Sequence, residues 1–270
     1  LVRARQRIRE LALPFAVPGP EELPARLDAV LGTLYLLFNE GYKASSGERL
    51  VREELCQEAL RLTQLLLGHP ATATPATEAL MALMLLTAAR LPARTDADGN
   101  LLRLHEQDRS SWDPHLIARG IVHLGRSAAG GTVTAYHLEA GIAACHSTAV
   151  DEASTDWSRI LGLYDRLIPL TRSPVAAMNR AVAVGRVHGP RAALEALDRI
   201  PQRRTVEDHY LYHAIRATFA AELGHDAEAR DLFRLAILRA QLPAEREFIA
   251  RRLAEMDRKQ IGRASCRERV

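Results

Sequence analysis

The chain has 270 residues, of which 47% are apolar and 5% aromatic, and its formal net charge of +3 divides into +3 over residues 1–10, +4 over residues 258–270 and −4 over residues 11–257. This length can fill the core of one long domain or two shorter ones, and the composition favours packed helices over a β-sandwich. Because an acidic body is a poor partner for phosphate backbones, we expect any contact with nucleic acid to come from the short basic N-terminal piece.

The chain opens with a basic segment and a proline-rich spacer. "LVRARQRIRE" has the composition of the end of a basic helix, and we assign residues 1–12 to it. Four prolines then fall within residues 13–24. Prolines this dense disfavour a helix and favour an extended, semi-rigid linker, so we place a domain boundary there.

Residues 25–130 are predicted to form a compact helical subdomain. Leu27, Leu31, Leu34 and Phe38 recur at helical spacing in its first helix, which we expect to end at Gly41 in a left-handed cap. The pairs Thr74-Pro75 and Asp113-Pro114 each combine a capping side chain with a first-turn proline, so each predicts a helix start.

Polar side chains follow the apolar stripe of that first helix directly. Asn39 and Glu40 lie at its margin, where a half-buried carboxylate is costly unless it is paired, and the segment 92–113 offers arginine partners. Two interpretations stay open, a polar network that holds this segment in place and a docking patch for another protein. The residues in question are Asn39, Glu40, Gly41, Tyr42, Arg90, Arg94, Asp108, Arg109 and Trp112.

Residues 131–257 contain a repeat. Alanine or a larger apolar residue recurs 36 positions apart, from Ala181, Ala193 and Leu197 to Ala217, Ala229 and Phe233. Small residues at such spacing let helices approach closely and are typical of stacked helix pairs. We therefore predict three TPR-like pairs in an all-α chain that resembles a solenoid.

No catalytic, cofactor or metal site is predicted. His209 and His213 are spaced i, i+4 but lack the glutamate of HExxH and a nearby cysteine pair. Three widely separated cysteines indicate a reducing compartment, and no apolar run or leader pattern indicates a membrane, so we expect a cytoplasmic protein. Residues 258–270 have no apolar period, and we interpret them as a non-native tail.

Two long motifs, "LYLLFNEGYKASSG" and "LMALMLLTAARLPARTDADGNLLRLHEQDRSSWD", resemble bacterial sigma factors of the extracytoplasmic-function type that carry a C-terminal, TPR-like extension. The resemblance covers residues 1–257 in order, and "LVRARQRIRE" is similar to the end of their promoter-reading helix-turn-helix module. The core-binding domain and most of the promoter-reading module are expected outside these residues. The resemblance implies RNA polymerase core and promoter DNA as partners of the complete protein, with weak DNA contact by Arg3, Arg5 and Arg7.

We therefore expect a non-enzymatic regulatory domain that binds protein, either the sigma module itself, polymerase or a regulator. The concave face of TPR-like pairs usually holds peptides through the first helix of each pair. Here that rule selects Tyr136, Asn179, Arg180, His209 and His213. The alternatives are a stand-alone TPR-like scaffold and a hydrolase or metal enzyme that uses the loop 96–115.

Overall fold

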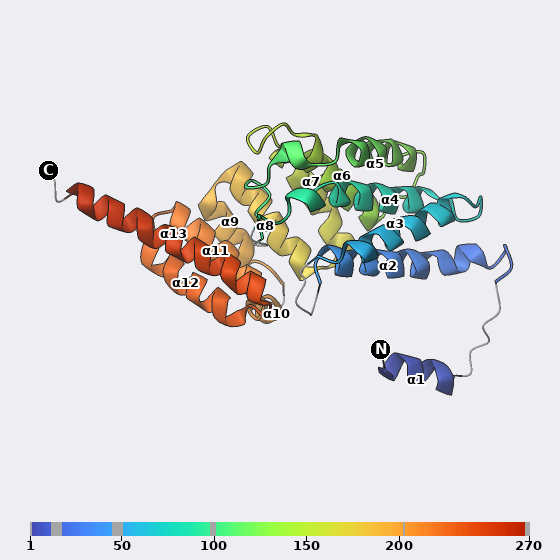
Figure 1. Cartoon of the computed structure of the whole chain (residues 1–270), viewed down its shortest axis with the longest axis horizontal. Helices are drawn as coiled ribbons and strands as arrows, with labels where there is room; N and C mark the ends of the chain where they lie inside the picture. Colours follow the sequence, from blue (N-terminus) through green and yellow to red (C-terminus); the bar gives the residue numbers. More distant parts are fainter. Residues whose placement is uncertain (1, 12–17, 45–50, 98–100, 202, 268–270) are drawn as a thin grey trace.

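A computed structural model describes residues 2–11, 18–44, 51–97, 101–201 and 203–267, and this part of the chain is all-α, as predicted (Figure 1). Within these ranges the only β feature is an isolated bridge between Thr95 and Leu101. Two short 3-10 helices, η1 (Leu91–Ala93) and η2 (Arg109–Ser111), lie between α4 and α5. The α-helices are α1 (Val2–Glu10), α2 (Leu23–Tyr42), α3 (Glu53–Leu67), α4 (Pro75–Ala88), α5 (Pro114–Ser127), α6 (Ala135–Thr148), α7 (Trp157–Thr171), α8 (Pro174–His188), α9 (Pro190–Asp198), α10 (Arg203–Glu207), α11 (Tyr210–Glu222), α12 (Asp226–Arg239) and α13 (Pro243–Arg267).

The two predicted helix starts are confirmed. The Thr74 hydroxyl accepts a hydrogen bond from the Thr77 amide at the start of α4. The Asp113 carboxylate accepts hydrogen bonds from the amides of His115 and Leu116 at the start of α5. Each cap satisfies amides that the first helical turn leaves without a partner.

The predicted linker, residues 13–24, overlaps the start of α2 by two residues. α2 begins at Leu23, because Pro24 in the first turn needs no amide hydrogen bond and is compatible with helix. The backbone of α13 continues as helix to Arg267, and the interpretation of residues 258–270 as a non-native tail stays a prediction. Residues 12–17, which include the first five residues of the predicted linker, lie outside the described part.

Gly41 does not end its helix. The prediction of a left-handed cap there is wrong, since the described glycines with positive φ are Gly189 and Gly224, and α2 continues to Tyr42. Gly41 is buried where α3 begins, and a β-carbon on it would lie 2.7 Å from the Cys56 amide nitrogen and 2.9 Å from the Arg52 carbonyl oxygen. Glycine is therefore needed for a close helix approach and not for a turn.

α4 is the central helix of the N-terminal half. It is buried on nearly all sides between α3, α5 and α6, and its buried side chains include Leu80, Met84 and Leu86. The stretch Pro75–Ala93 is long and apolar enough to cross a membrane by length and composition, and its 18-residue apolar window has a mean hydropathy of 1.3 and is 67% buried inside the protein. Such burial is what a core helix of a soluble protein shows.

The second half consists of consecutive helices that pack on their neighbours, α6 with α7, α8 with α9, and α11 with α12. The repeated positions are core positions, since Ala193, Leu197, Ala217, Ala229 and Phe233 are each at most 1% exposed. Gly189 (φ 89°) and Gly224 (φ 81°) make the tight turns within the second and third pairs. The pairs thus fall where the repeat predicts them, while their likeness to TPR geometry stays a prediction.

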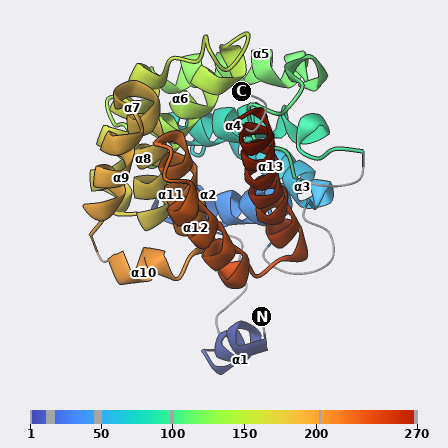
Figure 2. The same cartoon turned by 90° about the vertical axis from the view of Figure 1, so that its left-hand side faces the viewer.

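The two predicted halves share a core. Ala82, Leu83 and Leu86 of α4 pack against Ala140 and Ala143 of α6, across the predicted boundary at residues 130–131. The chain also curves back on itself, so that α2 and α13 meet (Figures 1 and 2). Because of this curvature, the helices of the two halves surround a common interior space.

Candidate functional site

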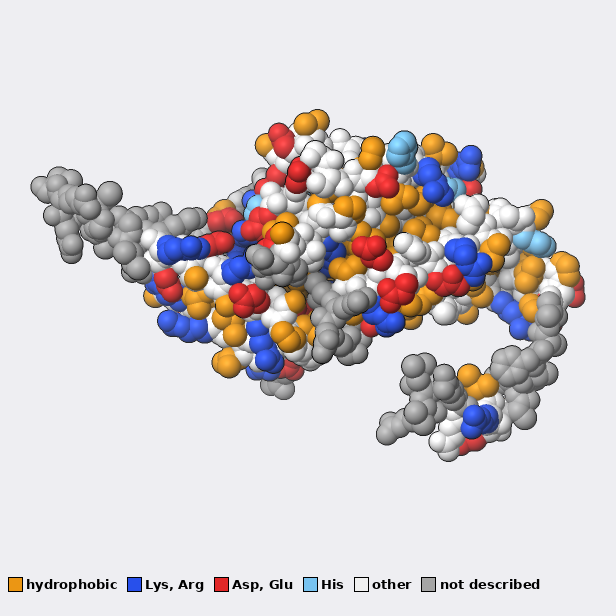
Figure 3. Space-filling view, in the orientation of Figure 1, with side chains coloured by type: hydrophobic (Ala, Val, Ile, Leu, Met, Phe, Trp, Pro, Cys, Tyr) orange, Lys and Arg blue, Asp and Glu red, His pale blue; other side chains and the backbone are white. Residues whose placement is uncertain are grey.

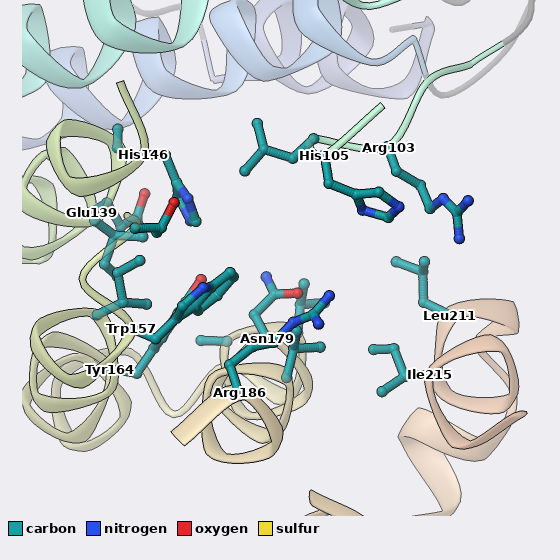
Figure 4. Close-up of a pocket in the computed structure, with 18 of the residues that line it drawn as sticks. Arg103, His105, Glu139, His146, Trp157, Tyr164, Asn179, Arg186, Leu211 and Ile215 are labelled. Carbon is teal, nitrogen blue, oxygen red and sulfur yellow. The ribbon is translucent and has the colours of Figure 1, made fainter. Parts of the chain in front are cut away.

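A cavity of about 630 Å³ lies inside this curve, between the N-terminal helices, the segment 103–109 and the helices α6–α8, α11 and α13. Figure 4 shows its wall, where side chains from several elements point toward one open space. The volume falls within the range of small-molecule pockets, about 300–1,000 Å³. The cavity is therefore the place where the fold can enclose a ligand.

Three successive helices contribute to this wall with the same spacing. Each presents two side chains seven residues apart, which is two helical turns and therefore one face. These pairs are Glu139 and His146 on α6, Trp157 and Tyr164 on α7, and Asn179 and Arg186 on α8. Sequence reasoning missed five of these six residues, although the shared spacing of seven was a signal that could have found them.

Arginines dominate the charges of the wall. The acids that line it number three, Glu139, Glu152 and Glu222. The guanidinium groups that line it are those of Arg90, Arg103, Arg109, Arg186 and Arg252. With two more cations than carboxylates, the cavity has an electropositive lining in a body that is acidic as a whole.

Several of these arginines have partners within the protein. Arg186 pairs with Glu152 at 2.9 Å, and Arg103 pairs with Glu106. The Nη1 atom of Arg109 donates to the carbonyls of His146 and Ala149, both at 2.7 Å. These contacts fix the positions of three cations and partly neutralise two of them.

Arg90 and His146 lie near each other in the wall of the cavity. In the described part of the chain, the buried Nε of Arg90 and the buried Nδ1 of His146 have no hydrogen-bond partner. Burial, followed by the charges of Arg90 and Arg109, lowers the pKa of His146 to about 4. The imidazole is therefore neutral near pH 7 and adds a polar atom without adding charge.

Aromatic side chains lie beside His146 in the wall of the cavity. Trp157 contacts His146 edge-to-face, with ring centroids 5.3 Å apart. Burial, followed by the charge of Glu139, raises the pKa of Tyr164 to about 12, and burial raises the pKa of Glu139. Glu139 accepts a hydrogen bond of 2.9 Å from the Tyr35 hydroxyl, so α2 and α6 are joined at the floor of the cavity.

The structure divides the predicted network around residues 39–42. Arg94 lies over the Tyr42 ring at 3.9 Å, so this part of the network joins α2 to the segment 92–113 as predicted. Arg109 instead lies over the buried Trp112 ring at 4.8 Å and bonds α6, away from α2.

The other members of the network have separate surroundings. Asp108 is exposed and caps η2 through the Ser110 amide, and Arg90 lines the cavity. Asn39 is exposed and Glu40 half-buried on the last turns of α2. Their membership in one docking patch with Arg90 and Arg109 stays a prediction.

The predicted concave face is also divided. Asn179 lines the cavity, whereas Arg180 pairs with Asp165 at 2.6 Å outside it. His213 is buried and bonds the Glu207 carbonyl, and His209 caps α11 through the Leu211 amide. Tyr136 packs against Tyr35, with ring centroids 5.6 Å apart.

Of the three arginines predicted to contact DNA, the structure describes the side chain of Arg7, which is exposed and pairs with Glu10 at 3.6 Å. The side chains of Arg3 and Arg5 lie outside the described part. On the face shown in Figure 3, the coloured basic and acidic side chains of the body are interspersed. DNA contact by α1 therefore stays a prediction from the sequence.

Comparison with known proteins finds two similarities. Residues 26–128 match a family described as a family of unknown function, DUF6596. An uncharacterized protein of Rhizobium meliloti (strain 1021) is 37% identical over 253 residues, which cover 94% of this chain and 59% of that relative. No solved structure matches the chain.

Proposed function

We propose that the chain is the regulatory, protein-binding C-terminal part of a sigma factor of the extracytoplasmic-function type. One observation carries the proposal beyond the sequence resemblance: both motifs that bear the resemblance contribute to the cavity wall. Tyr35 comes from the first motif, and Arg90, Arg103, His105 and Arg109 come from the second. A well-formed pocket is the usual place of a binding site, so the meeting of both motifs there supports a shared binding role.

The partners of the complete protein would be RNA polymerase core and promoter DNA, reached through domains beyond this chain. The relative supports this proposal, because about two fifths of its length lies outside the matched region and leaves room for such domains. The basic α1, followed by the spacer, would then be the end of the promoter-reading module. The helical body would act in the cytoplasm, on the sigma module, on polymerase or on a regulator.

The rival enzyme requires the acidic and histidine side chains of residues 96–115 to converge. Among the described residues, Asp96 instead approaches Arg251 of α13, and Asp108 caps η2 at the surface. His105 lines the cavity, and His115 is exposed on α5. This separation favours the regulatory role over hydrolytic or metal chemistry.

The test is transcription from a cognate promoter by core RNA polymerase and the full-length protein. We expect promoter-dependent transcripts, and we expect removal of residues 23–267 to change their yield at least several-fold. Glu40→Ala and Arg94→Ala test the predicted patch, with the exposed Arg119→Ala as the matched control. Failure of the full-length protein to bind core polymerase would overturn the sigma assignment, and an unchanged yield after the deletion would overturn the regulatory role.

A further inference from the structure

The geometry points to a ligand for the cavity itself: a small organic anion with a flat apolar body, held by Arg90 and His146 at its charged end and by Trp157 and Tyr164 along its body. This inference goes beyond the proposed function and does not depend on it. It rests on the volume of the cavity, its excess of guanidinium groups and the aromatic side chains in its wall.

The charged end of such a ligand is argued from Arg90. Arg90 lines the cavity while its Nε atom is buried, so the outer part of the guanidinium group would make the contact with a ligand. Arg109 adds a second positive charge beside His146. A carboxylate, sulfonate or phosphate group placed here would accept from the guanidinium, which is a strong, charge-assisted interaction.

His146 completes this end without opposing the anion. Its imidazole is neutral near pH 7, and its Nδ1 is buried without a partner in the described part of the structure. A neutral imidazole offers either a donor or an acceptor, depending on its tautomer. An anion beside the ring would stabilise the tautomer that donates from the ring nitrogen it contacts.

The body of the ligand is argued from the rest of the wall. Trp157 and Tyr164 present aromatic surface, and Leu211 and Ile215 add aliphatic surface. Flat apolar groups stack well on such rings. A cavity of about 630 Å³ holds a drug-sized molecule and excludes a folded partner domain.

The experiment compares two fluorescent probes that differ in charge. Anilinonaphthalene sulfonate is an aromatic anion, and N-phenylnaphthylamine has the same ring system without the sulfonate. Each is titrated into the whole purified chain, and its binding is followed by probe emission and by energy transfer from tryptophan. We expect one anionic probe per chain, bound at least about tenfold more tightly than the neutral probe, because one charge-assisted contact is worth this much.

Three variants locate the site. Arg90→Gln should weaken the anionic probe at least about tenfold and the neutral probe less than about twofold. Arg119→Gln, on the exposed face of α5, is the matched control and should change neither. Ile215→Trp fills the cavity from α11 and should weaken both probes.

Equal affinity for the two probes on the unaltered chain would overturn the proposal, and this comparison stands even if Arg90→Gln does not fold. Equal affinity of the anionic probe for Arg90→Gln and Arg119→Gln would also overturn it. So would full binding of both probes to folded Ile215→Trp, since the dyes would then occupy another surface.

Discussion

Gly41 is the residue at which a local rule and the packed structure disagree. A glycine after an apolar helical stripe usually marks a C-terminal cap, but here the next helix passes so close that no β-carbon fits. The atoms that a β-carbon would meet include the Cys56 amide nitrogen and the Arg52 carbonyl oxygen, and backbone atoms cannot rotate aside. The requirement for glycine was visible in the sequence, while its cause lies in a contact between helices.

Gly41→Ala should therefore destabilise the protein by about 1–3 kcal/mol, the usual cost of forcing an atom into a packed core. Gly32→Ala is the control within the same helix, because a β-carbon at Gly32 meets nothing within 4 Å. That variant should stabilise the protein by about 0.5–1 kcal/mol, since alanine is the better helix former. Urea denaturation measures both, and a shift of the same sign in the two variants would contradict the argument.

His146 makes stability depend on pH. Its pKa is about 4 in the folded state, below the ordinary value of 6.5, because burial and then Arg90 and Arg109 disfavour the charged form. The unfolded chain binds this proton first as the pH falls, so the contribution is fully present above pH 6.5 and is lost between pH 6.5 and 4.

The expected loss from this one group is about 3 kcal/mol over that interval. Urea denaturation between pH 7.5 and 4.5 should show the decline, and His146→Gln should make it shallower. Titration of the imidazole by NMR gives the pKa directly. A value near 6.5 in the folded protein would exclude the proposed environment of Arg90, Arg109 and apolar wall.

At the scale of elements, the sequence predicts what local chemistry controls. The caps at Thr74 and Asp113 and the core positions at Ala193, Leu197 and Phe233 follow from side-chain type and spacing alone. The cavity does not follow in this way, because its wall joins residues from α2 to α13. Within single helices, only the seven-residue spacing on α6, α7 and α8 indicates which residues form part of this wall.

Arg109 shows how one side chain connects two elements. It comes from η2, and its guanidinium donates to two carbonyls at the C-terminal end of α6, where helix carbonyls lack partners and the dipole is negative. The sequence predicts Arg109 in a network with residues 39–42, whereas its hydrogen-bond partners lie at the end of α6, because the choice depends on where α6 ends in space.

We expect Arg109→Ala to destabilise the protein by about 2 kcal/mol, since two hydrogen bonds to a charged group are lost. Arg109→Lys should recover only part of this, because an ammonium group lacks the planar fork of donors. Arg119→Ala on exposed α5 should change stability by less than about 0.5 kcal/mol. Urea denaturation of the three variants tests the connection, and equal effects at positions 109 and 119 would refute it.

At the scale of the molecule, the cavity exists because the chain closes on itself. Polar contacts join distant parts of the chain: the Arg251 guanidinium bonds the Leu101 carbonyl at 2.7 Å, and Lys43 pairs with Glu245 at 2.8 Å. Contacts over such separations have no local signature, so the sequence predicted a helical subdomain and stacked pairs but not their closure. This closure also places residues of the two long sequence motifs in the same cavity wall as α7, α8 and α11.

The Lys43–Glu245 pair is the sharpest test of that closure. The Glu245 side chain is 5% exposed, and Lys43 also contacts the Tyr210 hydroxyl at 3.2 Å, so α2, α11 and α13 meet at one point. Lys43→Met leaves a buried carboxylate without its cation and should cost about 1–3 kcal/mol, less than a fully buried pair would, because the Lys43 side chain is 37% exposed. Because Lys43→Met/Glu245→Gln removes the charge as well, it should recover much of this loss.

The double variant shows whether the Lys43–Glu245 ion pair contributes to stability. Urea denaturation gives the coupling energy, and small-angle scattering should show a larger radius of gyration for Lys43→Met if α13 leaves α2. Arg26→Met, which breaks an exposed pair with Glu22 at the start of α2, is the control and should change stability by less than about 1 kcal/mol. If Lys43→Met behaves like Arg26→Met, the ends of the helical body are held together by apolar packing alone, and the ion pair plays no part in forming the cavity.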